Sequence, residues 1–142
     1  MAGAPRRRPR HLESHEQRLF VQRFRLDPRT RDLPACAVPN GGLRSPREAA
    51  IMKAEGVEPG VPDWLLFAPQ RILPNAVSIL GAYGLALEFK SPTGKGRVTD
   101  HQKRWHALLR NSGWRVEIVT SAADAWRIVL DHLGYEKANA NG

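Results

Sequence analysis

The chain has 142 residues, with 22 lysines and arginines, 14 aspartates and glutamates, a net charge of +8 and an isoelectric point near 10.5. This length gives room for one domain only, and so basic a surface favours nucleic acid as the partner over an anionic membrane. Because no apolar run approaches the roughly 18 residues of a spanning helix, no signal-peptide segment is visible and Cys36 is alone, we expect a cytoplasmic protein with a free, buried thiol and no disulfide or cysteine zinc site.

Residues 1–10 are rich in arginine and proline and show no apolar period, which predicts a disordered basic arm. The arm could touch phosphates or simply aid solubility. From Leu12 the apolar positions follow a helical period, and Asp27-Pro28 ends that helix. Ser14 and Gln17 have the spacing of a capping box, and the helix dipole favours acidic side chains near a helix start. Both features give the glutamates of this segment a purely structural explanation.

The next segment predicts a short strand over Leu33–Val38 and then a turn over Pro39–Gly42. A second helix should follow, with Ser45 as its N-cap and Glu48 completing a capping box. Gly56 would end this helix, because glycine readily adopts the left-handed conformation of a C′ residue. Glu48 is therefore expected to cap a helix and not to bind a ligand.

Two apolar runs form the centre of the sequence. Asp63 opens the run Trp64–Phe67, and a second strand is expected over Leu85–Lys90. Because successive side chains in a strand alternate between faces, Glu88 and Lys90 should share one face of that strand. If the two strands pair, Asp63 lies at the edge of the sheet and two carboxylates gather beside one lysine.

The remaining segments are less uniform. Arg71–Tyr83 fits neither period and predicts a loop with at most a short strand, and Ser91–Val98 predicts a flexible basic loop. Thr99–Asn111 predicts a helix in which Thr99 and Gln102 form a capping box and Trp105, Leu108 and Leu109 share the apolar side. A strand over Trp114–Thr120 and a helix over Ser121–Leu133 complete the pattern.

The element order predicts an α/β fold with a central mixed sheet flanked by helices. We expect the basic arm at 1–10, one domain at 11–135 and a polar tail at 136–142.

Several motifs resemble a known nuclease family. Gly60-Val-Pro-Asp63 followed by Glu88-Phe-Lys90 resembles the signature of the PD-(D/E)XK nucleases. The surrounding motifs are similar to those of its VRR-NUC branch, the virus-type replication-repair nucleases: Pro39–Gly42, Arg47–Ala50, Lys53–Gly56 and Gln102–Trp105. Two features depart from the pattern, namely Phe89 where an aliphatic residue is usual and the stretch Pro69–Gly84. The resemblance implies a restriction-endonuclease-like core and a bacterial or phage-encoded protein.

The resemblance also implies a site for Mg²⁺ or Mn²⁺, which bind through a few hard oxygen ligands and keep several waters. The implied ligands are Asp63, Glu88, the backbone carbonyl of Phe89 and a glutamate of the first helix. Glu13 is the first choice for that glutamate, with Glu16 as the alternative.

Lys90 is expected to orient or help deprotonate the attacking water. A surface pair with Glu88 is the alternative, which would be favoured if Asp63 were absent. Gln102 would border the catalytic centre in this family, and the same residue could also cap its helix.

DNA contacts are expected from Asn40, Arg44, Lys95 and Arg97. For Asn40 and Arg44, each taken alone, turn geometry and solvated charge are the better explanations.

These features predict a metal-dependent DNA endonuclease that acts on branched replication, recombination or repair intermediates such as four-way (Holliday) junctions. The alternative is a DNA-binding module with a vestigial acidic cluster. No phosphate-binding loop, dinucleotide fingerprint or Gly-X-Ser-X-Gly motif is visible, so no nucleotide cofactor is expected.

The histidines have no recognisable metal spacing and should lie on the surface or on helix faces. Two cuts on opposed strands require two sites, so we expect a homodimer. The apolar stretch Ile72–Leu80 would supply the interface, or else cover its own sheet.

Overall fold

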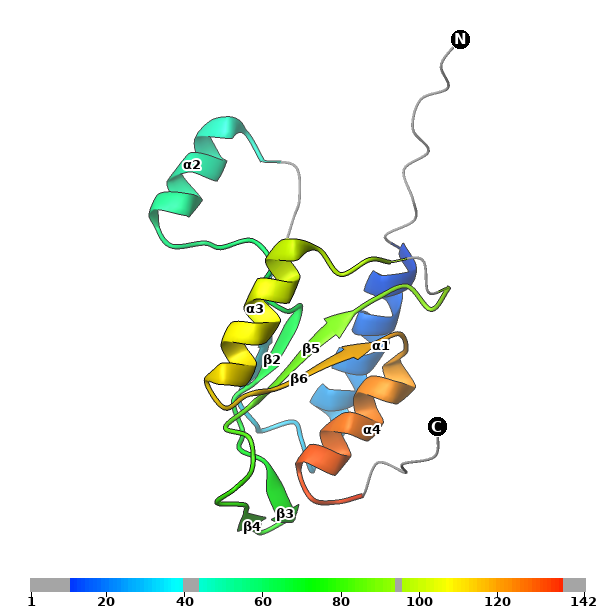
Figure 1. Ribbon diagram of the computed structural model, residues 1–142. Coiled ribbons are helices and arrows are strands. Elements are labelled where there is room, and N and C mark those ends of the chain that lie inside the picture. The colour runs from blue at the N-terminus through cyan, green and yellow to red at the C-terminus, as the bar shows by residue number, and fades with distance from the viewer. Residues whose placement is uncertain (1–10, 40–43, 94–95, 137–142) are drawn as a thin grey trace.

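A four-stranded mixed sheet lies at the centre of the computed structural model, which describes residues 11–39, 44–93 and 96–136 (Figure 1). Its strands, in spatial order, are β1 (Ala35–Ala37), β2 (Trp64–Leu66), β5 (Leu85–Phe89) and β6 (Arg115–Val119). β1 pairs antiparallel with β2, β2 pairs antiparallel with β5, and β5 pairs parallel with β6. The predicted mixed sheet is confirmed. The predicted arm at 1–10 and residues 137–142 of the predicted tail lie outside the described residues.

Helices cover both faces of this sheet. α1 (His11–Leu26) and α4 (Ala122–His132) pack against each other, whereas α3 (Asp100–Asn111) contacts β6 (Figure 1). Phe89 places its ring 5.8 Å from that of Phe20 in α1, and its neighbour Glu88 hydrogen-bonds Gln102 in α3. Because adjacent strand residues point to opposite faces, α1 and α3 lie on opposite sides of the sheet. All five residues of β5 are therefore buried, as expected for a strand that is covered on both faces.

The aromatic cluster that joins α1 to the sheet forms much of the core. Phe20 and Phe24 lie four residues apart on one face of α1, and both meet Trp64 edge-on at centroid distances of 4.8 and 4.9 Å. On α4, Ala125, Val129 and Leu133 are buried at the predicted helical spacing. The first and last helices are thus fixed to one sheet face by burial.

The segment expected to be a loop contains a small hairpin, which corrects the sequence prediction. β3 (Arg71–Leu73) pairs antiparallel with β4 (Ala76–Val77) across the two residues Pro74 and Asn75. Ile72, Leu73 and Val77 are largely exposed, so the apolar residues here do not alternate with burial as they do in a core strand. Gly134 allows the hairpin to lie close to the end of α4, because a Cβ on this residue would lie only 2.7 Å from the backbone of Leu73.

α2 (Pro46–Ala54) stands apart from the layered body (Figure 1). Its predicted ends are confirmed: Ser45 and Glu48 form the capping box, and Gly56 has φ +96°. No residue of α2 is buried, so local capping defines this helix and core packing does not.

Two predictions about side chains are wrong, namely those for Cys36 and Leu108. Cys36, expected to be buried, is exposed in the edge strand β1. Of the histidines expected on the surface or on helix faces, His106 and His132 lie in α3 and α4 and are buried, and the ring of His132 hydrogen-bonds the Ala68 carbonyl at 2.8 Å. On α3 the buried residue is His106, whereas Leu108, predicted on the apolar side, is 42% exposed. Within the described residues, no helix combines the length and apolar character needed to cross a bilayer.

Candidate active site

The predicted site residues meet at one end of the sheet. β5 ends at Phe89, and the antiparallel β2 begins directly after Asp63, so these two strand ends adjoin. The N-terminal turns of α1 and α3 reach the same end (Figure 1). Hydrogen bonds or ion contacts link the five side chains to this region: Glu13, Asp63, Glu88, Lys90 and Gln102.

Gly60 allows the segment before Asp63 to lie against α3. It has φ +91°, and a Cβ at this position would lie 2.4 Å from the carbonyl carbon of His101 and 2.8 Å from the Gln102 nitrogen. Only glycine fits both this left-handed backbone and this close approach. The first residue of the Gly-Val-Pro-Asp motif therefore has a packing role.

Asp63 accepts a 2.8 Å hydrogen bond from the Phe89 N–H through Oδ2. Continuing the pairing of Trp64 with Leu87 by two residues would place Pro62 opposite Phe89. In an antiparallel strand the Phe89 carbonyl points to the same edge as the Phe89 N–H, and so toward Pro62. Proline has no N–H, so Pro62 donates no backbone hydrogen bond to this carbonyl. Burial raises the pKa of Asp63, although the hydrogen bond from Phe89 counteracts this effect.

Gln102 joins the carboxylate of Glu88 to the amine of Lys90. Its Nε2 donates to Glu88 Oε1 at 2.6 Å, and its Oε1 accepts from Lys90 Nζ at 2.9 Å. Lys90 Nζ lies 3.5 Å from Glu88 Oε1. Gln102 also completes the capping box of α3 by accepting from the Thr99 N–H, so the two functions considered for this glutamine coexist in geometry.

Glu88 is 1% exposed, and burial together with the charge of Asp63 raises its pKa to about 8. Its Oε2 has no hydrogen-bond partner among the described residues and faces His106 Nε2 at 3.8 Å. Burial lowers the pKa of His106, so this contact is not an ion pair at neutral pH. His106 was not among the predicted site residues, although it lies four residues after Gln102 and hence on the same helix face.

The two glutamates considered in α1 have different surroundings. Glu13 Oε1 accepts a 2.9 Å hydrogen bond from the Ser91 N–H, directly after Lys90. Glu16 instead accepts from the Ala122 N–H at 2.7 Å, at the start of α4. Glu13 is thus the glutamate that reaches the centre, whereas Glu16 stabilises a helix end.

The sequence model of the VRR-NUC domain matches residues 6–123. The chain belongs to the VRR-NUC family. Among solved structures, a VRR_NUC domain protein is similar in fold, with a TM-score of 0.67 and 18% sequence identity over 87% of this chain and 89% of the other. No curated protein matches the sequence significantly. The predicted restriction-endonuclease-like placement is consistent with this family.

Nucleases of this kind generally use divalent metal ions, and the donor set of this VRR-NUC chain suits such an ion. The pKa values of Asp63 and Glu88 are raised, which indicates that the surrounding groups compensate the negative charge of these carboxylates poorly. Glu88 Oε2 is also buried without a hydrogen-bond partner among the described residues. Within the described residues, no group of three or more His, Cys, Asp or Glu side chains is placed to hold a metal ion. The fit is therefore to an ion bound through few carboxylates and several waters, as Mg²⁺ is.

The predicted DNA contacts are more scattered than the carboxylates of this VRR-NUC domain. Arg44 is partly buried beside α2, and Arg97 is exposed in the loop after β5. Asn40 and Lys95 lie outside the described residues.

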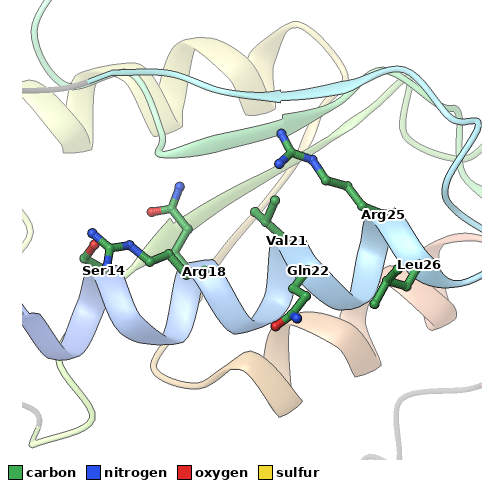
Figure 2. Close-up of a pocket in the computed structure, with 7 residues that line it drawn as sticks. Ser14, Arg18, Val21, Gln22, Arg25 and Leu26 are labelled. Carbon is green, nitrogen blue, oxygen red and sulfur yellow. The ribbon is translucent and has the colours of Figure 1, made fainter.

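An open groove of about 600 Å³ lies along α1 (Figure 2). It contains none of the predicted site residues, so the size of a cavity does not locate this site. Its lining residues are Ser14, Gln17, Arg18, Val21, Gln22, Arg25 and Leu26.

Proposed function

We propose that this VRR-NUC protein is a metal-dependent DNA endonuclease that acts in the cytoplasm on branched replication or recombination DNA such as four-way junctions. The observation that carries the proposal is the pair of carboxylates Asp63 and Glu88, whose pKa values are raised by burial beside Lys90. Buried carboxylates that are poorly compensated are costly to the fold and are typical of catalytic and metal-binding sites.

The ligands of Mg²⁺ or Mn²⁺ would be Asp63, Glu88, the Phe89 carbonyl and Glu13. A bound ion lowers the pKa of its water and polarises a phosphoryl oxygen. The Phe89 N–H orients the carboxylate of Asp63, and the amide of Gln102 does the same for Glu88. Each carboxylate is therefore held by a group that is itself fixed in a strand or a helix.

Lys90 would act on the attacking water and on the charge that develops at phosphorus. Its side chain is 12% exposed, and Gln102 accepts a hydrogen bond from its ammonium group. A partly desolvated ammonium stabilises developing negative charge more strongly than a solvated one. Gly96 packs against the side chains of this centre, since a Cβ there would be 3.2 Å from Lys90 Cδ and 3.3 Å from Glu13 Oε1, so the loop after β5 passes directly beside the centre.

DNA would reach this centre along the basic surface. The net charge of +8, the exposed Arg97 and the partly buried Arg44 support nucleic acid as the partner. Asn40, Lys95 and the arm at 1–10 complete the proposed contacts, although they lie outside the described residues.

The proposal includes a homodimer. Between the hairpin and β5 the apolar side chains are strongly exposed: Ile79 is 97%, Leu80 is 94% and Tyr83 is 71% exposed. This exposure supports an interface and argues against the alternative that the stretch covers its own sheet. Two copies related by a two-fold axis would present two centres to opposed DNA strands.

The test is cleavage of labelled linear, flap and four-way-junction DNA in Mg²⁺, in Mn²⁺ and in EDTA. We expect metal-dependent cuts that favour the branched substrates, and loss of roughly 10²-fold or more in rate for Asp63→Asn and Lys90→Ala. Glu55→Gln, a change to an exposed carboxylate, is the control and should leave the rate unchanged. Binding without cleavage in either metal would favour the non-catalytic DNA-binding module.

A further inference from the structure

Helix α2 is defined without any help from the core. Its capping box, its proline at the first position and Gly56 all specify a helix of nine residues, yet none of these residues is buried. So short a helix is marginal in isolation, and its largest aliphatic side chain, Ile51, is 48% exposed. A segment with strong local signals and no packing role is a candidate for contact with a partner.

A cleft of about 450 Å³ separates α2 from the start of α3. This volume is within the range of about 300–1,000 Å³ that is typical of ligand sites. Its lining combines apolar side chains, including Met52 and Val57, which we call the floor, with polar side chains, including Arg44, Lys53 and His101, which we call the rim. The other lining residues are Pro39, Ala49, Glu58 and Pro59.

The two permanent cations of the rim form no close ion pair in the described part of the chain. Neither Arg44 nor Lys53 lies within 4.0 Å of a described carboxylate, although the charge of Arg44 contributes to lowering the pKa of the nearby Glu48. Glu58 is the cleft's only described carboxylate, so the rim carries a net positive charge beside the apolar floor. A ligand that matches both parts has a flat apolar portion and an anionic portion.

We propose that this cleft binds an unpaired nucleotide of the DNA substrate, with the base on the Met52 and Val57 floor and its phosphate against Arg44 and Lys53. In a duplex the bases are stacked inside, so a paired strand offers phosphates to the rim and nothing to the floor. An unpaired nucleotide offers both, and apolar contact with the face of its base does not depend on sequence. The inference rests on the proposed function, because it identifies the cleft as the part of the nuclease that distinguishes branched from paired DNA.

The cleft and the carboxylate cluster are connected through adjacent residues of the chain. His101 lines the cleft, and the next residue, Gln102, hydrogen-bonds Glu88. Pro59 lines the cleft as well, and Gly60 packs on the backbone of His101 and Gln102. A nucleotide in the cleft would thus be only a short stretch of backbone away from the proposed scissile phosphate.

The experiment measures DNA binding by fluorescence anisotropy with the full chain in EDTA, so that no strand is cut. The two probes are a blunt duplex and the same duplex with a splayed arm of a few unpaired nucleotides. The variants are Lys53→Ala at the rim, Met52→Ser on the floor and Arg47→Ala as the control, because Arg47 is an exposed cation of α2 outside the cleft. None of the three should affect the core, since α2 buries no residue.

We expect the parent to prefer the splayed probe, and Met52→Ser to reduce that preference roughly threefold or more by removing apolar contact area. Lys53→Ala should lower the preference too and flatten the log–log salt dependence for the splayed probe by about 0.7, the contribution of one single-strand phosphate. Arg47→Ala should leave the preference unchanged.

Equal affinity of the parent for both probes, or equal losses with Lys53→Ala and Arg47→Ala, would overturn the inference. Cleavage in Mn²⁺ separates this failure from that of the proposed function. A parent that cuts DNA without any dependence on the cleft keeps the nuclease and loses the nucleotide site. A parent that shows the dependence in EDTA and cuts nothing in Mn²⁺ loses the nuclease and keeps the site.

Discussion

Replacing Glu88 by glutamine should make the metal-free protein more stable at alkaline pH and inactive as a nuclease. The carboxyl group is 1% exposed, and its pKa is raised from 4.5 to about 8. A carboxyl group whose folded pKa lies above its unfolded pKa stabilises the fold below the unfolded value, and that stability is lost as pH rises toward the folded value. The amide of Glu88→Gln keeps the shape and does not ionise.

The size of the effect follows from the two pKa values. Between about pH 5.5 and pH 8.5, in EDTA, the parent should lose roughly 3 kcal/mol of unfolding free energy relative to Glu88→Gln. Urea titrations followed by circular dichroism at both pH values measure this difference. Glu55→Gln, on the surface, should behave like the parent. Mn²⁺ should restore the stability of the parent at pH 8.5, because a bound ion compensates the charge of the carboxylate. The stability of Glu88→Gln, which carries no such charge, should not change.

The reasoning about Glu88 would be refuted by a parent that is equally stable in EDTA at both pH values. It would also be refuted by a Glu88→Gln variant that is less stable than the parent at about pH 8.5, since the ionised carboxylate would then be compensated within the protein.

Three further predictions concern the surface, the backbone and the assembly. DNA affinity should fall with salt at a log–log slope of about −0.9 per duplex phosphate, and deletion of residues 1–10 should flatten that slope; a salt-independent affinity would contradict nucleic acid as the main partner. Gly60→Ala should lower the unfolding free energy by roughly 2 kcal/mol or more, and by more than Gly56→Ala, which has a similar φ and nothing within 4 Å; equal losses in thermal unfolding would show that the contact with α3 costs nothing. Ile79→Asp with Leu80→Asp should halve the mass measured by light scattering, and a single-chain mass for the parent with and without junction DNA would end the dimer proposal.

Most of the fold could be predicted because its signals are local. Ser45 and Glu48 at α2, and Thr99 and Gln102 at α3, are capping boxes in sequence and in structure. The hairpin β3–β4 was not predicted, because its side chains are exposed and its pairing leaves no apolar period to read.

For the candidate site, residue types and strand alternation were sufficient to place Glu88 and Lys90 on one face, and Asp63 at the adjoining strand end. The sequence could not distinguish Glu13 from Glu16, because that distinction depends on the rotation of α1 against Ser91 and Ala122. The helical spacing that could have identified His106 is visible only once Gln102 is known to face Glu88.

The hydrogen bond between the Ser91 N–H and Glu13 joins residues that are 78 positions apart, and it determines when during folding the proposed activity can appear. Contacts between distant segments close late, because the chain must lose much of its loop entropy before they form. The proposed catalytic centre also needs Gln102, so a nascent chain has no complete centre until α3 has left the ribosome and packed on the sheet. Partly folded forms should therefore be inactive, and cleavage activity should disappear in the same denaturant range as the tertiary structure and not before it.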